Sequence, residues 1–288
     1  MNNRQRIVLT RLVLGSILFF LLMRWAEKVT LSGLSAPPMF NVNLDFTYWL
    51  YKWSGLPGFL TGNKIIAVLF DSFLFLTGIL SFLFPLHRKW IIPFSILLFF
   101  YALTYDLYAT HSFAQVIGFI VVLLPFWITS TDKFFLAWQG IRYFTCLIYT
   151  LAFTWKTWFN NSFYYGQQGI NSLKANMVDY MYLNPDSLMT GFYKWCIRHE
   201  ALINGGEKFI IILEGLMVIG FFTKKYDRLL IWIPVLIHLA TYLFADVFFF
   251  ELLVIDLSFL SVSQLDRIGN CFTIFSLSKR RRRENILR

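Results

Sequence analysis

Long apolar runs recur along this chain, and short basic turns separate several of them. Of its residues, 57% are hydrophobic and only 15% are charged, whereas a soluble globular domain has about 45–50% apolar and about 25% charged residues. Such runs are typical of helices that cross a membrane, because a helix satisfies its own backbone hydrogen bonds in lipid. The sequence therefore predicts an all-α polytopic membrane protein.

About eight of these runs are expected to be transmembrane helices, of which the last two are short. They cover residues 7–23, 64–84, 90–106, 116–128, 140–156, 207–222, 229–244 and 247–261. The first run is not interpreted as a cleaved signal peptide, because it lacks a small-residue cleavage site. We expect one transmembrane helical domain over residues 1–265 and a basic cytoplasmic tail over residues 266–288.

Basic clusters indicate which side of the membrane each turn faces, because cytoplasmic turns are enriched in lysine and arginine. Four clusters fall on one predicted side, at residues 4–6, 87–89, 224–228 and 279–283. The protein is therefore expected in the cytoplasmic (inner) membrane, with both termini in the cytoplasm. Residues 131–133 would form another inner turn. The outer face would carry the loop region 160–206, in which Gly205-Gly206 is a turn signal.

The charge and the cysteines exclude other classes of protein. The net charge of +10 does not indicate nucleic-acid binding, because much of it lies in clusters beside apolar runs. The three cysteines, Cys146, Cys196 and Cys271, are too few and too scattered for a disulfide framework or a metal site. We therefore expect membrane lipids as partners, no nucleic acid and no metal.

A single lysine, Lys156, lies at the outer end of the predicted helix 140–156. Counting back from Lys156 in steps of 4, 3, 4 and 3 residues gives Ala152, Tyr149, Thr145 and Arg142. These residues lie with Lys156 on one small and polar face of the helix. An ionisable residue in a membrane helix is a candidate functional residue. Alternatively, Lys156 only extends its ammonium group to the lipid headgroups at the helix end.

His111 is expected at the same outer membrane face as Lys156. Trp155 and Trp158 flank the lysine, and desolvation by these rings would favour a neutral amine that can act as a base. A nearby histidine could hold that amine, relay its proton or stabilise an anion. Alternatively, His111 simply caps an outer loop.

Other ionisable residues lie inside apolar runs. His238 follows Pro234 by four residues, and we expect a structural role for it because the proline frees a backbone carbonyl. Buried carboxylates are costly in a membrane and are normally paired or line a wet cavity. This applies to Asp71, Glu214, Glu251 and Asp256. At least one of Asp71, Glu214 and Glu251 is expected to pair with a basic or hydroxyl side chain.

Three elements resemble a family that comprises vitamin K-dependent gamma-carboxylase and its bacterial relatives, the horizontally transferred transmembrane domain (HTTM) proteins. One segment is similar to the helix that bears the family's catalytic lysine, and its register is kept by Tyr149, Ala152 and Lys156. A second resembles the element with a supporting histidine, with matches at His111, Ser112 and Phe113. A third is similar at His238, Leu243 and Phe244.

The sequence also departs from the family pattern. Thr110 replaces an asparagine before the supporting histidine, and Ala245-Asp246 replaces an isoleucine-glycine pair. The large lumenal domain of the vertebrate carboxylase, which takes part in substrate handling, has no counterpart after the eighth predicted helix. The resemblance therefore implies a short bacterial member with the carboxylase-like transmembrane fold.

The resemblance also implies a reaction with a reduced quinone of the vitamin K type. Lys156 would be the catalytic base and His111 the supporting catalytic residue. The quinone-binding residues would be Tyr149, Trp155, Trp158 and His238. In the family the hydroquinone anion reacts with oxygen, and the strong base so formed deprotonates a glutamate for carboxylation, a lyase-type reaction. A partner membrane protein or secreted protein would then supply that glutamate.

Two other classes of function remain open. A non-catalytic scaffold or accessory subunit of a membrane complex could keep the same fold, because fold does not imply function. A small-solute transporter is the third class, and the sequence has no evident inverted repeat or paired broken helices to favour it. A lipid-accessible outer pocket beside Lys156 would favour chemistry on a quinol.

Overall fold

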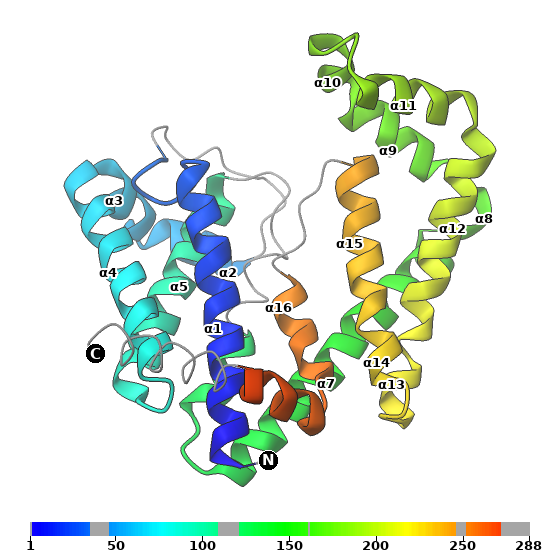
Figure 1. Ribbon diagram of the computed structural model, residues 1–288. Coiled ribbons are helices and arrows are strands. Elements are labelled where there is room, and N and C mark those ends of the chain that lie inside the picture. Colours follow the sequence, from blue (N-terminus) through cyan, green and yellow to red (C-terminus); the bar gives the residue numbers. More distant parts are fainter. Residues whose placement is uncertain (1, 35–45, 109–120, 161, 246–251, 272–288) are drawn as a thin grey trace, which may run out of the picture. The chain divides into compact units, whose positions relative to one another are not determined.

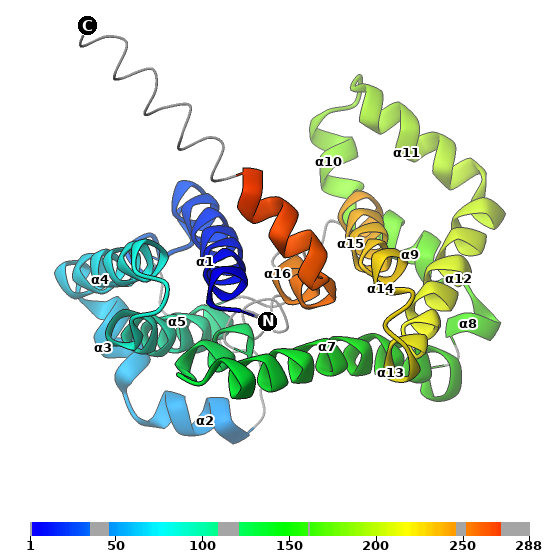
Figure 2. The same cartoon turned by 60° about the horizontal axis from the view of Figure 1, so that its bottom comes forward.

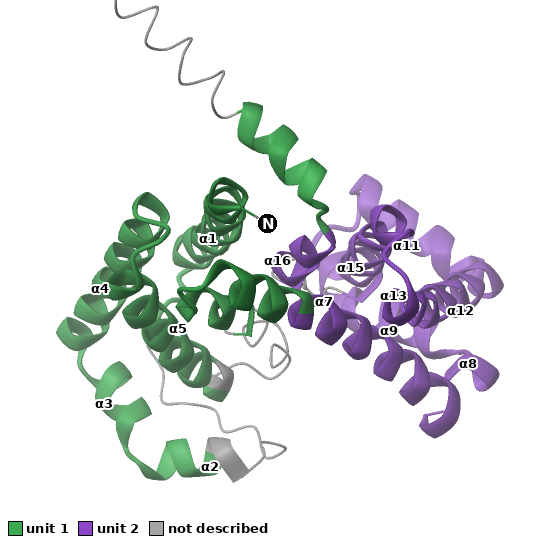
Figure 3. Ribbon diagram, turned by 90° about the horizontal axis from the view of Figure 1, so that it is seen from below, with its two compact units in different colours: residues 1–139, 260–288 green, residues 140–259 purple. Residues whose placement is uncertain are grey.

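The computed structural model describes residues 2–34, 46–108, 121–160, 162–245 and 252–271. Every regular element within these ranges is a helix (Figure 1), which confirms the predicted all-α class. The helices form two compact units, coloured separately in Figure 3. Unit 1 comprises Met1–Gln139 with Leu260–Arg288, and unit 2 comprises Gly140–Phe259. The predicted boundary at residue 265 is not tested by this division.

Unit 1 is a bundle around three long helices. Its elements are α1 (Asn3–Ala26), α2 (Phe46–Trp53), α3 (Leu56–Gly62), α4 (Lys64–Leu83), α5 (Arg88–Tyr108), η1 (Leu124–Trp127), the first part of α7 (Thr131–Thr154) and a helix at 262–271. Helix α4 packs beside both α1 and α5 (Figure 2). Gly78 permits this close approach, because a Cβ atom there would lie 2.8 Å from Leu18 and 2.9 Å from Phe94.

Buried polar side chains of unit 1, such as Arg6 and Asp71, form hydrogen bonds with backbone groups. The Arg6 guanidinium donates hydrogen bonds to the carbonyl oxygens of Ile128 and Thr129. The Asp71 carboxylate accepts hydrogen bonds from the backbone N–H groups of Leu31, at 3.2 Å, and Ser32, at 2.8 Å. Asp71 therefore meets its hydrogen-bonding needs through main-chain donors, and a buried acid satisfied in this way needs no cation beside it.

Unit 2 begins inside α7 and consists mainly of short helices. They are η2 (Trp155–Phe159), α8 (Ser162–Tyr165), α9 (Gln168–Asn176), α10 (Val178–Leu183), α11 (Leu188–Arg198), α12 (Glu200–Leu216), α13 (Ile219–Phe222), α14 (Asp227–Leu230), α15 (Trp232–Ala245), α16 (Leu253–Asp256) and η4 (Leu257–Phe259). One core cluster joins Cys146 and Tyr149 of α7 to Met217, Ile233 and Ile237. A second lies among α9, α10 and α11, and includes Leu173 and Cys196.

Three helices among the described residues are long and apolar enough to cross a membrane: Asn3–Ala26, Lys64–Leu83 and Asp227–Ala245. They match the predicted spans 7–23, 64–84 and 229–244. Helix α4 also exposes an apolar stripe at Ile65, Leu69, Phe73 and Leu76, as expected for a lipid-facing surface. Parts of the predicted spans 116–128 and 247–261 lie outside the described residues.

Two predicted turns are wrong. Residues 131–133 are not a turn between helices but the first turn of α7, which begins at Thr131 with Asp132 near its positive end. Gly205-Gly206 lies within α12, not between elements. A glycine costs about 1 kcal/mol in a helix relative to alanine, but α12 packs against α9 and α15, and this tertiary packing overrides the local preference.

Candidate functional site

The polar face predicted on the helix before Lys156 is directed into unit 2. Arg142, Thr145 and Tyr149 are all buried. The α-helix then ends at Thr154, and residues Trp155–Phe159 continue as one π-helical turn. The N–H of Asn160 donates to the carbonyl of Trp155 at 2.8 Å, five residues back. Such turns are rare and are frequently found at functional sites, and this one contains Lys156.

Lys156 forms an ion pair with Glu214 of α12. The distance between Lys156 Nζ and Glu214 Oε1 is 2.6 Å, and the exposed fractions of the two side chains are 33% and 4%. The second oxygen, Oε2, is buried and has no hydrogen-bond partner among the described residues. Glu214 therefore fulfils the expectation that at least one buried acid pairs with a basic side chain. Within this pair the carboxylate is buried and the amine is partly accessible.

Lys156 also lines a cavity of about 560 Å³ within unit 2. The rest of the wall comes from α9, α11, α12 and α15 and is mostly apolar. Its aromatic members are Phe192, Trp195, Phe209 and Phe244. The charged lining residues are Lys156 and Glu207. A largely apolar cavity of this size with a few polar groups is the usual form of a small-molecule site.

Trp155 and Trp158 do not line this cavity. Both rings are more than half exposed, and Trp155 stacks on Phe159 with 5.5 Å between the ring centroids. Leu151, Trp155 and Phe159 follow one another in steps of four and form an exposed apolar stripe on this side of the helix. The screening of Lys156 by Trp155 or Trp158 stays a prediction, and the contact that the structure gives the lysine ammonium is with Glu214.

Tyr149 and His238 form a second buried pair. Tyr149 Oη lies 2.9 Å from His238 Nε2, and both residues are less than one tenth exposed. Neither lines the cavity beside Lys156. This contact agrees with the expected structural role of His238.

Helix α9 is fixed to α12 by two side-chain caps at its first turn. Glu207 Oε2 accepts a hydrogen bond from the N–H of Gly169 at 2.7 Å, and Asn204 Oδ1 accepts one from Ile170 at 3.3 Å. These side chains satisfy backbone donors that a helix start leaves free. One wall of the cavity is thus held against the helix that carries Glu214.

His111 and Glu251 lie outside the described residues, so the expected convergence of His111 with Lys156 stays a prediction. The sequence indicates Lys156 and Glu214 individually but not their pairing, since 58 positions separate them. It did not identify Glu207 or the aromatic residues of α11. The spacing of Phe192 and Trp195 could have indicated that they share an apolar face, because they lie three residues apart in a short, strongly amphipathic helix.

In comparisons with protein-family models, with curated proteins and with solved structures, nothing matched this chain.

Proposed function

We propose that this protein acts on a lipid-like hydroquinone bound in the cavity beside Lys156, with the lysine amine as the base. The observation that carries this proposal is the position of Lys156, which lines a mainly apolar cavity and pairs with a buried carboxylate. The motif resemblance to the carboxylase and HTTM family supplies the reaction class. We place that reaction in the cavity that Lys156 lines.

The cavity suits a flat, apolar ring system. Its volume of about 560 Å³ falls within the roughly 300–1,000 Å³ of typical ligand pockets. Phe192, Trp195 and Phe244 offer faces and edges for an aromatic ring. A bound hydroquinone would supply a weakly acidic hydroxyl and a reduced ring that oxygen can oxidise.

The ion pair supplies a way to free the amine. A Lys156 ammonium donates to Glu214 Oε1 across 2.6 Å, a distance over which a proton passes within one hydrogen bond. Transfer of that proton leaves a neutral amine and a carboxylic acid without changing the charge of the pair. The amine lone pair then accepts the proton of a hydroxyl in the cavity, which restores the ammonium.

The proposed setting is the cytoplasmic membrane, crossed by about eight helices. The three apolar helices support a membrane location, and the basic clusters motivate the orientation with both termini in the cytoplasm. Residues 160–206, which supply α9 and α11 to the cavity, would then lie on the outer side. A quinol dissolved in the bilayer would reach Lys156 from the outer leaflet.

The competing proposal is a scaffold or accessory subunit without catalysis. In that case the Lys156–Glu214 pair would serve only to satisfy a buried acid, which is a sufficient structural reason for an ion pair. The two proposals differ in what Lys156→Arg does. Arginine keeps the positive charge beside Glu214, but it does not release its proton near neutral pH.

The test uses purified protein in lipid nanodiscs and a short-chain vitamin K-type hydroquinone under air, with quinol loss followed by absorbance. We expect Lys156→Ala and Lys156→Arg each to lower the rate by about 100-fold or more, the usual contribution of a general base. Lys174→Ala is the matched control, because Lys174 forms an exposed ion pair with Glu200 and does not line this cavity. A parental rate for Lys156→Arg would contradict the proposal.

A further inference from the structure

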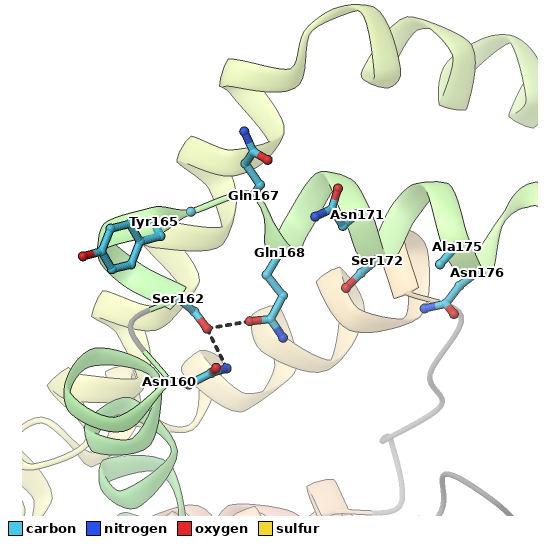
Figure 4. Close-up of a pocket in the computed structure, with 10 residues that line it drawn as sticks. Asn160, Ser162, Tyr165, Gln167, Gln168, Asn171, Ser172, Ala175 and Asn176 are labelled. Atoms are coloured by element: carbon cyan, nitrogen blue, oxygen red, sulfur yellow. Dashed lines mark hydrogen bonds between the residues drawn. The ribbon is translucent and has the colours of Figure 1, made fainter.

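A second cavity of unit 2 is lined by amide and hydroxyl groups. Its volume is about 490 Å³, and it runs from the end of η2 past α8 and along α9. Five amide side chains line it, at Asn160, Gln167, Gln168, Asn171 and Asn176. No charged side chain lines this groove among the described residues. We call it the amide groove; Figure 4 shows its residues.

The groove is partly preorganised by its own hydrogen bonds. Asn160 Nδ2 donates to Ser162 Oγ at 2.8 Å, and Ser162 Oγ donates to Gln168 Oε1 at 2.6 Å. Ser162 itself is buried, and Figure 4 shows Gln168 directed toward it. These two hydrogen bonds hold the Gln168 side chain in place. Its Oε1 atom accepts from Ser162, and its Nε2 amino group is left to donate to a ligand. Such fixed side chains lose less entropy on binding than free ones.

The chemistry of the lining selects the class of ligand. Each amide side chain can both donate and accept hydrogen bonds, and so can each hydroxyl group. A ligand with several hydroxyl groups can match both halves of an amide, whereas an anion or a cation matches only one half. The groove therefore favours a neutral, hydroxyl-rich molecule.

The amide groove adjoins the apolar cavity. Gln168 and Ser172, one helical turn apart on α9, line both of them. A molecule with a polyhydroxylated head and an apolar tail could place its head in the groove and its tail in the cavity. The tail would then contact Phe192 and Phe244.

We propose that the amide groove is a binding site for a neutral sugar. The sugar can be free or can be the head of a lipid, and the chemistry of recognition is the same. This inference goes beyond the proposed action on a quinol. Its readout is glycoside binding, so either proposal can fail while the other stands.

The test is isothermal titration calorimetry on the protein in nanodiscs, with empty nanodiscs as the blank. The probes are maltose, octyl glucoside below its micelle concentration, and octyl phosphate. We expect saturable binding of octyl glucoside and no binding of octyl phosphate above the blank. If octyl glucoside binds and maltose does not, the ligand is a sugar that needs an apolar tail. If maltose also binds, a free sugar is sufficient for binding.

The decisive variant is the double change Asn171→Ala with Asn176→Ala. Both side chains are exposed, and alanine has the higher helix propensity, so α9 should keep its fold. Loss of two neutral hydrogen bonds should weaken octyl glucoside binding about ten-fold. Asn184→Ala is the matched control, because Asn184 is exposed and lies outside both cavities. Parental affinity in the double variant, equal binding of octyl phosphate, or no glycoside binding at all would overturn the proposal.

Discussion

Gly220 of α13 packs its backbone directly against the Sγ atom of Cys146 on α7. A Cβ atom built on Gly220 would lie well within the van der Waals contact distance of that sulfur and 3.3 Å from Leu230. Cys146 is fully buried in the main core cluster of unit 2. The absence of a side chain at position 220 thus sets how closely α13 approaches α7.

Gly220→Ala should therefore destabilise unit 2. Overpacking of a close-packed core costs roughly 1–3 kcal/mol, which should appear as a lower midpoint of thermal unfolding. Adding Cys146→Ala removes the clashing sulfur and should recover part of the loss. Gly205→Ala in α12 is the control: a Cβ atom added there would meet no neighbouring group within 4 Å, so it should leave stability unchanged or raise it. Equal midpoints for Gly220→Ala and the parent would refute the close contact.

Removal of the Arg142 side chain should be more costly still. Its guanidinium donates two hydrogen bonds to the Asp227 carboxylate, at 2.6 and 3.0 Å, and others to the carbonyls of Gly220 and Thr223. Loss of one partner of a buried ion pair costs about 3–5 kcal/mol. We expect Arg142→Ala to lower the free energy of unfolding by an amount of this order, measured by denaturant unfolding in detergent.

A matched exposed ion pair controls for the arginine change. Lys174 and Glu200 are each about half exposed, and surface pairs contribute about 0–1 kcal/mol. Lys174→Ala should thus leave the unfolding curve almost unchanged. If both variants shift the curve equally, the four hydrogen bonds of Arg142 do not stabilise the folded state as the structure indicates.

Tyr149→Phe removes the hydroxyl that contacts His238 Nε2 at 2.9 Å. A buried polar group that loses its partner costs about 1–3 kcal/mol, so we expect a lower unfolding midpoint. Tyr182→Phe should have no effect, since Tyr182 is strongly exposed. A nitrogen-15 NMR spectrum of labelled histidine provides an independent check, and an unchanged His238 signal in Tyr149→Phe would contradict the contact.

Membrane orientation can be tested with the native cysteines. Cys271 is exposed, whereas Cys146 and Cys196 are buried. Burial also raises the pKa of the Cys196 thiol, which makes it less reactive. In sealed cells, an impermeant maleimide should label Asn184→Cys in a Cys271→Ser background but should not label Cys271 in the parent. Labelling of both from outside would show that the predicted topology is wrong.

The sequence predicted those features that depend on local pattern. Apolar length located α1 and α4, with α4 observed at Lys64–Leu83 against the predicted 64–84. Steps of three and four residues placed Arg142, Thr145 and Tyr149 on one helix face, and the structure buries all three. These properties follow from helix periodicity, which does not depend on distant parts of the chain.

Features that depend on tertiary contacts were not predicted. The partner of Lys156 comes from another helix, and an apolar sequence pattern does not determine which of several acids faces it. The family resemblance, not a local pattern, implied that Trp155 and Trp158 bind a quinone ring, and in the structure both side chains are more than half exposed and lie outside the cavity that Lys156 lines. Gly205-Gly206 resembled a turn because the contacts of α12 with α9 are not visible in the local sequence.

The wall shared by the amide groove and the apolar cavity has a thermodynamic consequence. Gln168 and Ser172 can each adopt only one orientation at a time, and both residues line the two cavities. An occupant that reorients either side chain changes the affinity of the neighbouring cavity for its own occupant. Such linkage is reciprocal: the factor by which a glycoside changes quinol affinity must equal the factor by which a quinol changes glycoside affinity.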